Sequence, residues 1–177
     1  MIKSGFFLIT DISGYTQFLT DSELVHANEI LQSLLKSQLE NIKPPFKVSR
    51  FQGDAIQTYA ISDEIIRPEM IVEMVEQIYF QFKDHVRQAD FNTTCDCTAC
   101  SNIKNLDLKI IVHHGEFIIQ NMGDREELQG RDVIVAHRLE KNSIKDKHGI
   151  SAYAVFSSAA IRAAKMDAIA ENTIAHK

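Results

Sequence analysis

The sequence has little glycine or proline: 7 Gly and 3 Pro among 177 residues, of which 45% are hydrophobic and 24% charged. This composition excludes collagen-like and disordered chains, so we expect residues 1–177 to form a single globular domain. Apolar runs of the about 20 residues that a membrane-spanning helix needs are also missing. The N-terminal Met-Ile-Lys-Ser-Gly lacks the long apolar stretch of an export signal. We therefore expect a cytoplasmic protein without a membrane partner.

An excess of positive charge is absent as well. With 19 Lys and Arg against 24 Asp and Glu, the formal net charge is −5, which argues against a chain that coats a nucleic-acid polymer. Any bound phosphate must therefore be held by a local site. Cysteine is scarce: the 3 residues Cys95, Cys97 and Cys100 are an odd number within one short tract, which excludes a disulfide framework.

The apolar residues follow strand and helix periods in turn. Strands are predicted at residues 6–9, 46–51, 55–61, 106–112, 116–120 and 151–156, the fourth and fifth joined at a Gly115 hinge and followed by an acidic loop. Helices are predicted at residues 21–42, 68–89 and about 133–139, and after a cap at Ser157 or Ser158. Because hairpins alternate with helices, we expect an α+β fold with a mostly antiparallel, ferredoxin-like (split βαβ) sheet and helices on one face. Residues 91–105 lack an apolar period and are expected to be an insertion outside the core.

Two aspartates follow short predicted strands. Asp11 comes after the first strand, and Asp54 lies in the Gly-containing connection of a predicted hairpin. In a split βαβ sheet these strands can lie side by side, so the two carboxylates would face each other and suit a hard cation such as Mg²⁺. Gly14 would let backbone N–H groups after Asp11 approach phosphate oxygens. The alternative interpretation is that both are ordinary acids in surface turns.

Four segments resemble, in order and spacing, the signatures of class III nucleotidyl cyclases, the catalytic domains of adenylate and guanylate cyclases. They are residues 11–16, 51–55, 112–116 and 129–139, within a match from about residue 5 to residue 156. The resemblance implies the same split βαβ-type fold and a homodimer whose subunits share each site. It also implies a purine nucleoside triphosphate as substrate, converted to cyclic AMP or GMP and pyrophosphate.

The resemblance also assigns roles to residues of this chain. The metal-binding positions, which in the family hold two Mg²⁺ or Mn²⁺ ions, are Asp11, Ile12 and Asp54. The nucleotide-binding positions are Ser13, Gly14, Tyr15 and Thr16 in the triphosphate turn, Gly53, and Glu127 in place of a purine-reading acid. Arg138 matches the arginine that stabilises the transition state from the partner subunit.

Three family positions differ in this chain. Val48 replaces the purine-reading lysine, Ile134 replaces the asparagine that orients the ribose, and a further transition-state lysine has no clear counterpart. Loss of one oriented donor typically slows a reaction about a hundred- to a thousandfold. We therefore expect impaired cyclisation. The alternatives are a non-catalytic nucleotide- or effector-binding regulatory module of the same fold, and a structural dimer without ligand.

The tract Cys95-x-Cys97-x-x-Cys100 is a second candidate site. Three thiolates at this spacing can bind Zn²⁺ with a fourth ligand, for which the candidates are His113, His114, His85 or Asp96. Incidental loop thiols or a redox-labile tract are the alternatives. The tract is similar to one found in an uncharacterised bacterial branch of cyclase-like proteins.

Overall fold

A six-stranded sheet forms the centre of the molecule in the computed structural model, which describes residues 1–65, 67–123, 125–171 and 173–175. Its strands are β1 (Ile2–Ser13), β2 (Lys47–Gln52), β3 (Ala55–Ile61), β4 (Asp107–Met122), β5 (Arg125–Gln129) and β6 (Tyr153–Phe156). The order is β2-β3-β1-β4-β5, and β6 pairs with β4. The β4–β6 pair is parallel, while β1–β3, β1–β4, β2–β3 and β4–β5 are antiparallel. The predicted α+β fold with a mostly antiparallel sheet is therefore confirmed.

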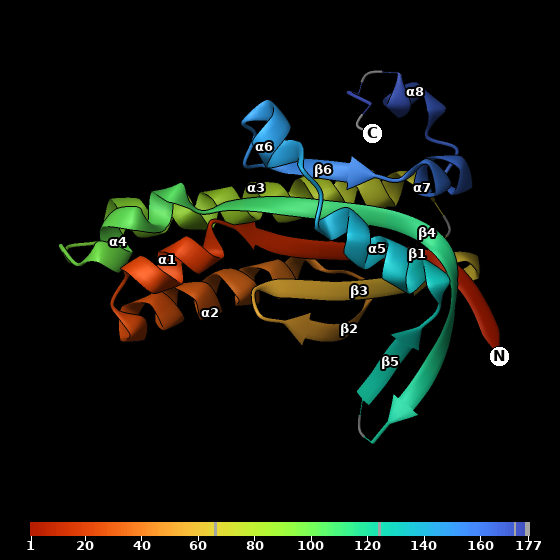
Figure 1. The fold of residues 1–177 in the computed structure, drawn as a ribbon, viewed down its shortest axis with the longest axis horizontal. Helices are drawn as coiled ribbons and strands as arrows, with labels where there is room; N and C mark the ends of the chain where they lie inside the picture. Colours follow the sequence, from red (N-terminus) through yellow and green to blue (C-terminus); the bar gives the residue numbers. More distant parts are fainter. Residues whose placement is uncertain (66, 124, 172, 176–177) are drawn as a thin grey trace.

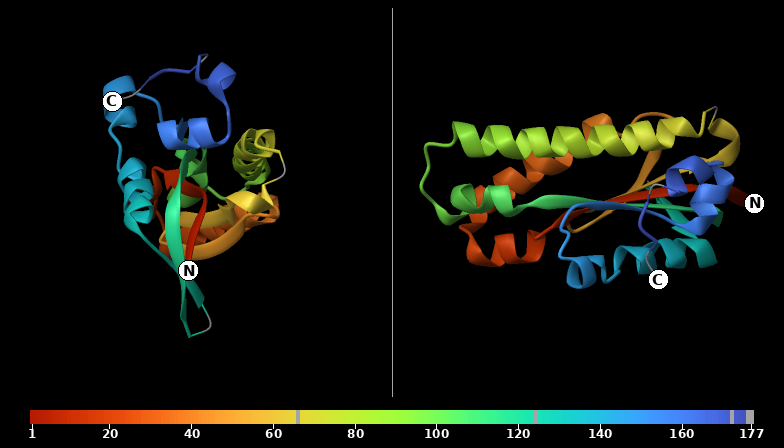
Figure 2. Two further views of the ribbon diagram at one scale, coloured as in Figure 1. Left: turned by 90° about the vertical axis from the view of Figure 1, so that its right-hand side faces the viewer. Right: turned by 90° about the horizontal axis from the view of Figure 1, so that it is seen from above.

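The helices of the described residues cover both faces of this sheet. They are α1 (Tyr15–Asp21), α2 (Leu24–Asn41), α3 (Glu69–Asn92), α4 (Thr98–Asn102), α5 (Arg131–Glu140), α6 (Ile144–His148), α7 (Ser158–Ala163) and α8 (Asp167–Ala170), with 3-10 turns η1 (Ser62–Glu64) and η2 (Ile103–Asn105). The long helices α2 and α3 lie on one face, as predicted, but α5 packs on the other face, which differs from the predicted arrangement of helices on one face only (Figures 1 and 2). Within the described ranges, no helix combines the length and the apolar character needed to cross a membrane.

Strand β1 explains how one sheet supports two hydrophobic cores. Successive side chains of a strand point to opposite faces. Phe6, Leu8 and Ile12 are buried in the larger core, beneath α2 and α3. Phe7 and Ile9 are buried in the smaller core, to which α5 contributes. The continuous apolar run of β1 thus reflects burial of both faces, which fixes the strand in the middle of the sheet.

Residues 107–122 form one strand, which differs from the predicted pair of strands hinged at Gly115. Gly115 lies in extended backbone and pairs with Gly5 of β1. A Cβ at Gly115 would lie 2.3 Å from the Cβ of Asp132, so glycine is needed for the close approach of α5 rather than for a bend. Asp132 Oδ2 accepts a hydrogen bond from Glu116 N–H at 2.7 Å. The predicted acidic loop after this strand contains β5, which forms a hairpin with the end of β4.

The segment 91–105 is not an insertion outside the core, as its lack of an apolar period had suggested. Helix α3 extends to Asn92, and the short elements α4 and η2 follow. Ala99 of α4 and Ile103 of η2 are almost completely buried in the larger core, together with Leu106. Because each of these elements is only one turn long, its apolar residues are too few to produce a periodic pattern in the sequence.

Candidate functional site

The structure brings Asp11 and Asp54 together at one end of the sheet. Asp11 is near the end of β1, directly opposite Ala55, and Asp54 precedes Ala55 in the β2–β3 turn with Gly53. Partial burial, together with the hydrogen-bonding contact to Asp11 and its negative charge, raises the pKa of Asp54 to about 7. Two carboxyl groups in contact cannot both ionise freely, so in the absence of a cation they tend to share one proton.

Lys109 is the group that the sequence analysis missed at this site. It is opposite Asp11 on β4, and its Nζ forms an ion pair with Asp11 Oδ2. Burial disfavours the charge of Lys109, but the hydrogen bond and negative charge of Asp11 outweigh it and raise the pKa of Lys109. Asp11 is only 8% exposed. One of the two acids therefore already has a cationic partner, which any metal ion would have to displace or accommodate.

The turn after Asp11, to which the resemblance assigns triphosphate binding, contains a left-handed glycine. Gly14 joins β1 to α1 in the left-handed region with φ 91°, a conformation that strains other residues. Its carbonyl accepts a hydrogen bond from Phe18 N–H at 2.9 Å, which starts α1. Ser13 is buried and Thr16 is exposed. Ile12 is 2% exposed, with its side chain in the core, so that only its backbone could face a ligand.

A polar cavity of about 300 Å³ adjoins this turn. Its lining residues are Gly14, Gln17, Phe18, Asp21, Asn102, Asn105, Leu106 and Lys145. The cavity is thus bounded by the start of α1, by the segment that follows α4, and by α6. Tyr15, the remaining residue assigned to the triphosphate turn, is partly buried and packs against the larger core.

The other positions assigned from the cyclase resemblance do not gather around Asp11 and Asp54 within one chain. Arg138 lies on the exposed side of α5, one turn after Ile134, which is 56% exposed. Glu127 lies on β5, where its Oε2 forms an ion pair with Arg50 of β2 at 3.1 Å. Val48, also on β2, is 39% exposed. The acid assigned to purine recognition is therefore already paired within its own subunit.

The cysteine tract meets a histidine from a distant part of the chain. His26 Nδ1, in the first turn of α2, is 3.2 Å from Cys97 Sγ and 3.7 Å from Cys95 Sγ. One ligand atom from each of His26, Cys95, Cys97 and Cys100 lies within 4.8 Å of the others. The charge and hydrogen bond of Cys97 raise the pKa of His26.

The four predicted candidates for a fourth ligand are wrong, because the chain places them elsewhere. His113 Nδ1 and His114 Nε2 contact Ser157 Oγ and Ser62 Oγ at 2.8 and 2.9 Å. His85 Nε2 contacts Ser33 Oγ at 2.7 Å. Asp96 is exposed and does not belong to the cluster found among the described residues. Burial lowers the pKa of His113.

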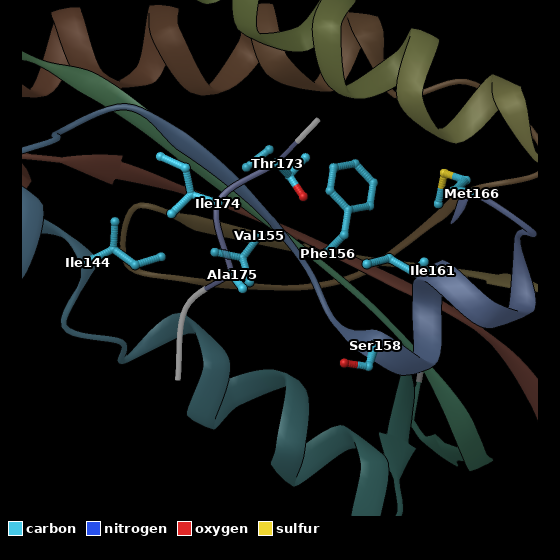
Figure 3. A pocket seen from close by; sticks show the side chains of 10 residues that line it. Ile144, Val155, Phe156, Ser158, Ile161, Met166, Thr173, Ile174 and Ala175 are labelled. Atoms are coloured by element: carbon cyan, nitrogen blue, oxygen red, sulfur yellow. The ribbon is translucent and has the colours of Figure 1, made fainter. Parts of the chain in front are cut away.

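A separate apolar cavity of about 270 Å³ lies beside β6 and α7 (Figure 3). Its labelled lining side chains include Ile144, Phe156, Ile161 and Ile174, which come from α6, β6, α7 and the C-terminal segment. The lining contains no charged side chain among the described residues. Its chemistry therefore does not suit a triphosphate, and it is distinct from the acidic pair.

Sequence comparison identifies the family. Residues 31–148 match a family described as "Protein of unknown function (DUF2652)". The chain belongs to this family. A curated relative of this DUF2652 chain is the uncharacterized protein Rv2561/Rv2562 of Mycobacterium tuberculosis (strain ATCC 25618 / H37Rv), 29% identical over 114 residues. The match covers 64% of the DUF2652 chain and 52% of the relative, so the chain spans about half the length of that protein.

Solved structures establish the fold of this DUF2652 chain. A bacterial light-regulated adenylyl cyclase is similar with a TM-score of 0.69 and 16% identity, over 92% of this chain and 79% of the other. A class III adenylyl cyclase-like ATP-binding protein from Pseudomonas aeruginosa is similar with a TM-score of 0.60 and 14% identity, over 92% of this chain and 35% of the other. The DUF2652 chain thus has a class III cyclase-like fold, in agreement with the sequence resemblance.

Proposed function

We propose that this chain binds a divalent-metal complex of a purine nucleoside triphosphate at Asp11 and Asp54, at the interface of a homodimer. The observation that carries the proposal is the contact of the Asp11 carboxyl group, near the end of β1, with the Asp54 carboxyl group in the β2–β3 turn, next to the left-handed turn at Gly14. The class III cyclase-like fold supports it, because the same residues match that family's metal and triphosphate signatures.

The donor atoms of the pair fit Mg²⁺ or Mn²⁺. These hard cations prefer carboxylate oxygens and keep places for water and substrate phosphates. Burial and the neighbouring Asp11 raise the pKa of Asp54 to about 7, so Asp54 tends to hold a proton in the metal-free protein, and a divalent ion would displace that proton. A bound divalent ion would neutralise phosphate charge and activate a ribose hydroxyl there.

Lys109 has two effects in this proposal. In the free protein its ammonium group competes with a metal ion for Asp11, because the two groups form an ion pair. If metal and nucleotide displaced Lys109 from Asp11, its ammonium group would be available to a phosphate group. Gly14 leaves backbone N–H groups accessible in the turn, and Lys145 adds a second cation in the lining of the adjoining cavity.

A homodimer accounts for the separation of the remaining assigned residues. Arg138 is exposed on α5, as a residue that serves a partner subunit must be. Exposed apolar side chains on β2, β4 and α5 offer surface that association would bury: Val48, Phe51, Ile118, Met122 and Ile134. The Arg50–Glu127 ion pair would fix the β4–β5 hairpin against β2 in each subunit.

Cyclisation is expected to be impaired. Ile134 offers no hydrogen-bond donor to a ribose, and Val48 offers none to a purine.

These substitutions favour a second candidate function, in which the dimer binds nucleotide or another effector without turnover and acts as a regulatory module. In this second interpretation, the cysteine tract holds a structural zinc ion. A protein with a similar fold that is described as cyclase-like and ATP-binding supports it.

Thermal unfolding with Mn²⁺ and each purine triphosphate tests binding. A ligand that binds only the folded protein raises Tm, and the rise grows with the logarithm of the ligand concentration relative to Kd. We expect ATP or GTP to raise Tm in the presence of Mn²⁺, and Asp54→Asn to abolish the shift. Asp63→Asn, which changes an exposed acid in η1, is the matched control and should keep it. No shift with any triphosphate would reject the proposed function.

Pyrophosphate release separates the two candidate functions. A cyclase must release pyrophosphate from ATP or GTP with Mn²⁺, and Asp54→Ala must abolish the release. Nucleotide binding without pyrophosphate, measured at high protein concentration, identifies the regulatory module instead.

A further inference from the structure

We propose that Cys95, Cys97, Cys100 and His26 together bind one Zn²⁺ ion, which fastens the segment before β4 to the start of α2. The inference goes beyond nucleotide binding and does not depend on it. The three thiols come from one tract, whereas the imidazole comes from a residue about 70 positions earlier in the sequence. The fold alone brings the four side chains into one cluster.

The spacing of the ligand atoms is close to that of a tetrahedral zinc site. Zn–S bonds of about 2.3 Å and Zn–N bonds of about 2.0–2.1 Å place ligand atoms about 3.5–3.8 Å apart. The distances from His26 Nδ1 to Cys97 Sγ and Cys95 Sγ are 3.2 and 3.7 Å. All four atoms lie within 4.8 Å of one another, so small side-chain movements suffice to surround an ion.

The chemistry of the donors selects a soft or borderline cation. Three thiolates and one imidazole form a Cys₃His set, which is a common structural zinc site. Mg²⁺ and Ca²⁺ prefer oxygen ligands and would not compete. Because four protein ligands complete the tetrahedron, no position is left for water or substrate, and the role of the ion is structural.

The backbone around the cluster is already arranged to hold these ligands. Cys97 caps α4, and its Sγ accepts a hydrogen bond from Cys100 N–H at 3.4 Å. Glu23, which precedes α2, accepts hydrogen bonds from Thr98 N–H at 3.2 Å and Ala99 N–H at 3.1 Å. Hydrogen bonds from backbone N–H groups lower the pKa of Glu23 to about 2. A metal ion would thus lock a junction that hydrogen bonds already define.

The position of this junction suggests what the ion stabilises. Helix α4 contacts both α1 and α2, and it leads directly into η2. The carbonyl oxygen of Asn105, at the end of η2, lies 3.4 Å from where a Cβ of Gly14 would be. The metal-bound segment therefore forms one wall of the Gly14 turn, and zinc would hold that wall in place.

Metal analysis of the purified full chain, prepared under reducing conditions without added chelator, tests the proposal. We expect about one zinc per chain in the wild type and in His85→Ala, and a zinc affinity at least about 100-fold lower in His26→Ala. His85 is the matched control because it joins α2 to α3 through Ser33, outside the cluster. Equal zinc affinity in His26→Ala and the wild type, measured by competition with a chromophoric chelator, would overturn the assignment of His26.

Cobalt substitution provides a readout that does not depend on the stability of a variant. Co²⁺ bound to wild-type protein should give thiolate-to-cobalt charge-transfer bands and the intense visible bands of tetrahedral coordination. Zn²⁺ should displace it at one equivalent. Absence of these bands, iron in place of zinc, or a disulfide among the cysteines in the reduced preparation would overturn the proposal. Nucleotide binding is measured separately, so its failure would leave these outcomes unchanged.

Discussion

The acidic pair and the cysteine cluster are the two proposed metal sites, and their side chains have different partners in the metal-free protein. Asp11 is ion-paired with Lys109, and Asp54 is raised in pKa by burial and by its neighbour. In the cluster, His26 and the three cysteines face one another, and the nearby Glu23 is engaged with backbone N–H groups. To bind a cation, the acidic pair must first give up the ion pair between Asp11 and Lys109. The cysteine cluster needs only small side-chain movements.

This difference indicates two kinds of metal use. A site that must break an existing ion pair binds a metal ion weakly when no other ligand is present. It binds the ion more strongly when a nucleoside triphosphate adds negative charge. A site with preassembled soft ligands holds its ion permanently. We therefore expect a transient metal at Asp11 and Asp54 and a resident metal at the cysteine cluster.

Removal of the resident metal gives the largest expected effect. A strong zinc chelator should lower Tm of the wild type by more than about 10 °C, because binding energy at a structural zinc site contributes directly to folding. Removing Mg²⁺ or Mn²⁺ alone, with zinc retained and no nucleotide present, should leave Tm nearly unchanged. Differential scanning calorimetry measures both. Equal effects of the two treatments would contradict the distinction between the sites.

Lys109→Met should tighten Mn²⁺ binding to the free protein by about tenfold, corresponding to about 1.4 kcal/mol. The substitution frees Asp11 and removes a positive charge that repels the ion. Titration calorimetry with Mn²⁺ provides the measurement. Lys83→Met, which removes a 3.3 Å ion pair with Asp107 near the same end of β4, is the control and should have little effect. Weaker binding in Lys109→Met would show that Lys109 does not compete.

The pH dependence of stability should report the raised pKa of Asp54 in the absence of divalent ions. Between the ordinary pKa of 3.8 and the folded-state value of about 7, the folded protein holds a proton that the unfolded chain has released. The contribution of Asp54 to stability is therefore full below pH 3.8 and is lost as the pH rises towards 7. Urea unfolding across this range should show a shallower decline in Asp54→Asn than in Asp63→Asn.

Glu23→Gln is expected to give the smallest effect. The amide keeps one acceptor oxygen for the N–H groups of Thr98 and Ala99 but loses the charge and the second oxygen. Since Glu23 is exposed, we expect Tm to fall by only a few degrees, about 2–4 °C, with zinc still bound. Loss of zinc in this variant would show that Glu23 does more than cap α4.

The sequence predicted correctly those features that depend on the order of neighbouring residues, such as strand-forming runs and helix caps. Asp11 and Asp54 follow strand-forming runs, and the structure puts them at the same sheet end. Ser157 was predicted as a cap, and its Oγ accepts a hydrogen bond from Ala160 N–H at 3.1 Å. The Ser157 cap depends on residues within a few positions of one another, which a single sequence displays, whereas the meeting of Asp11 and Asp54 was predicted from the strand arrangement of a split βαβ sheet.

The missed features depend on contacts between distant segments. Lys109 belongs to a strand pattern that gives no sign of its pairing with Asp11, and His26 resembles any polar residue on an amphipathic helix. Strand β5 was read as an acidic loop because Glu126 and Glu127 are poor strand formers. Their partners, Tyr59 Oη at 2.6 Å and Arg50 Nη1 at 3.1 Å, come from other strands and stabilise the hairpin.

The burial of Ala99 and Ile103 in the larger core links the state of the cysteines to the resistance of the protein to proteolysis. Damage to the cysteines by oxidation would loosen α4 and expose core residues, so the whole domain would become accessible to proteases. With the proposed zinc ion bound to the cysteines, resistance of the protein to proteolysis would then depend on zinc and on the redox state of the thiols.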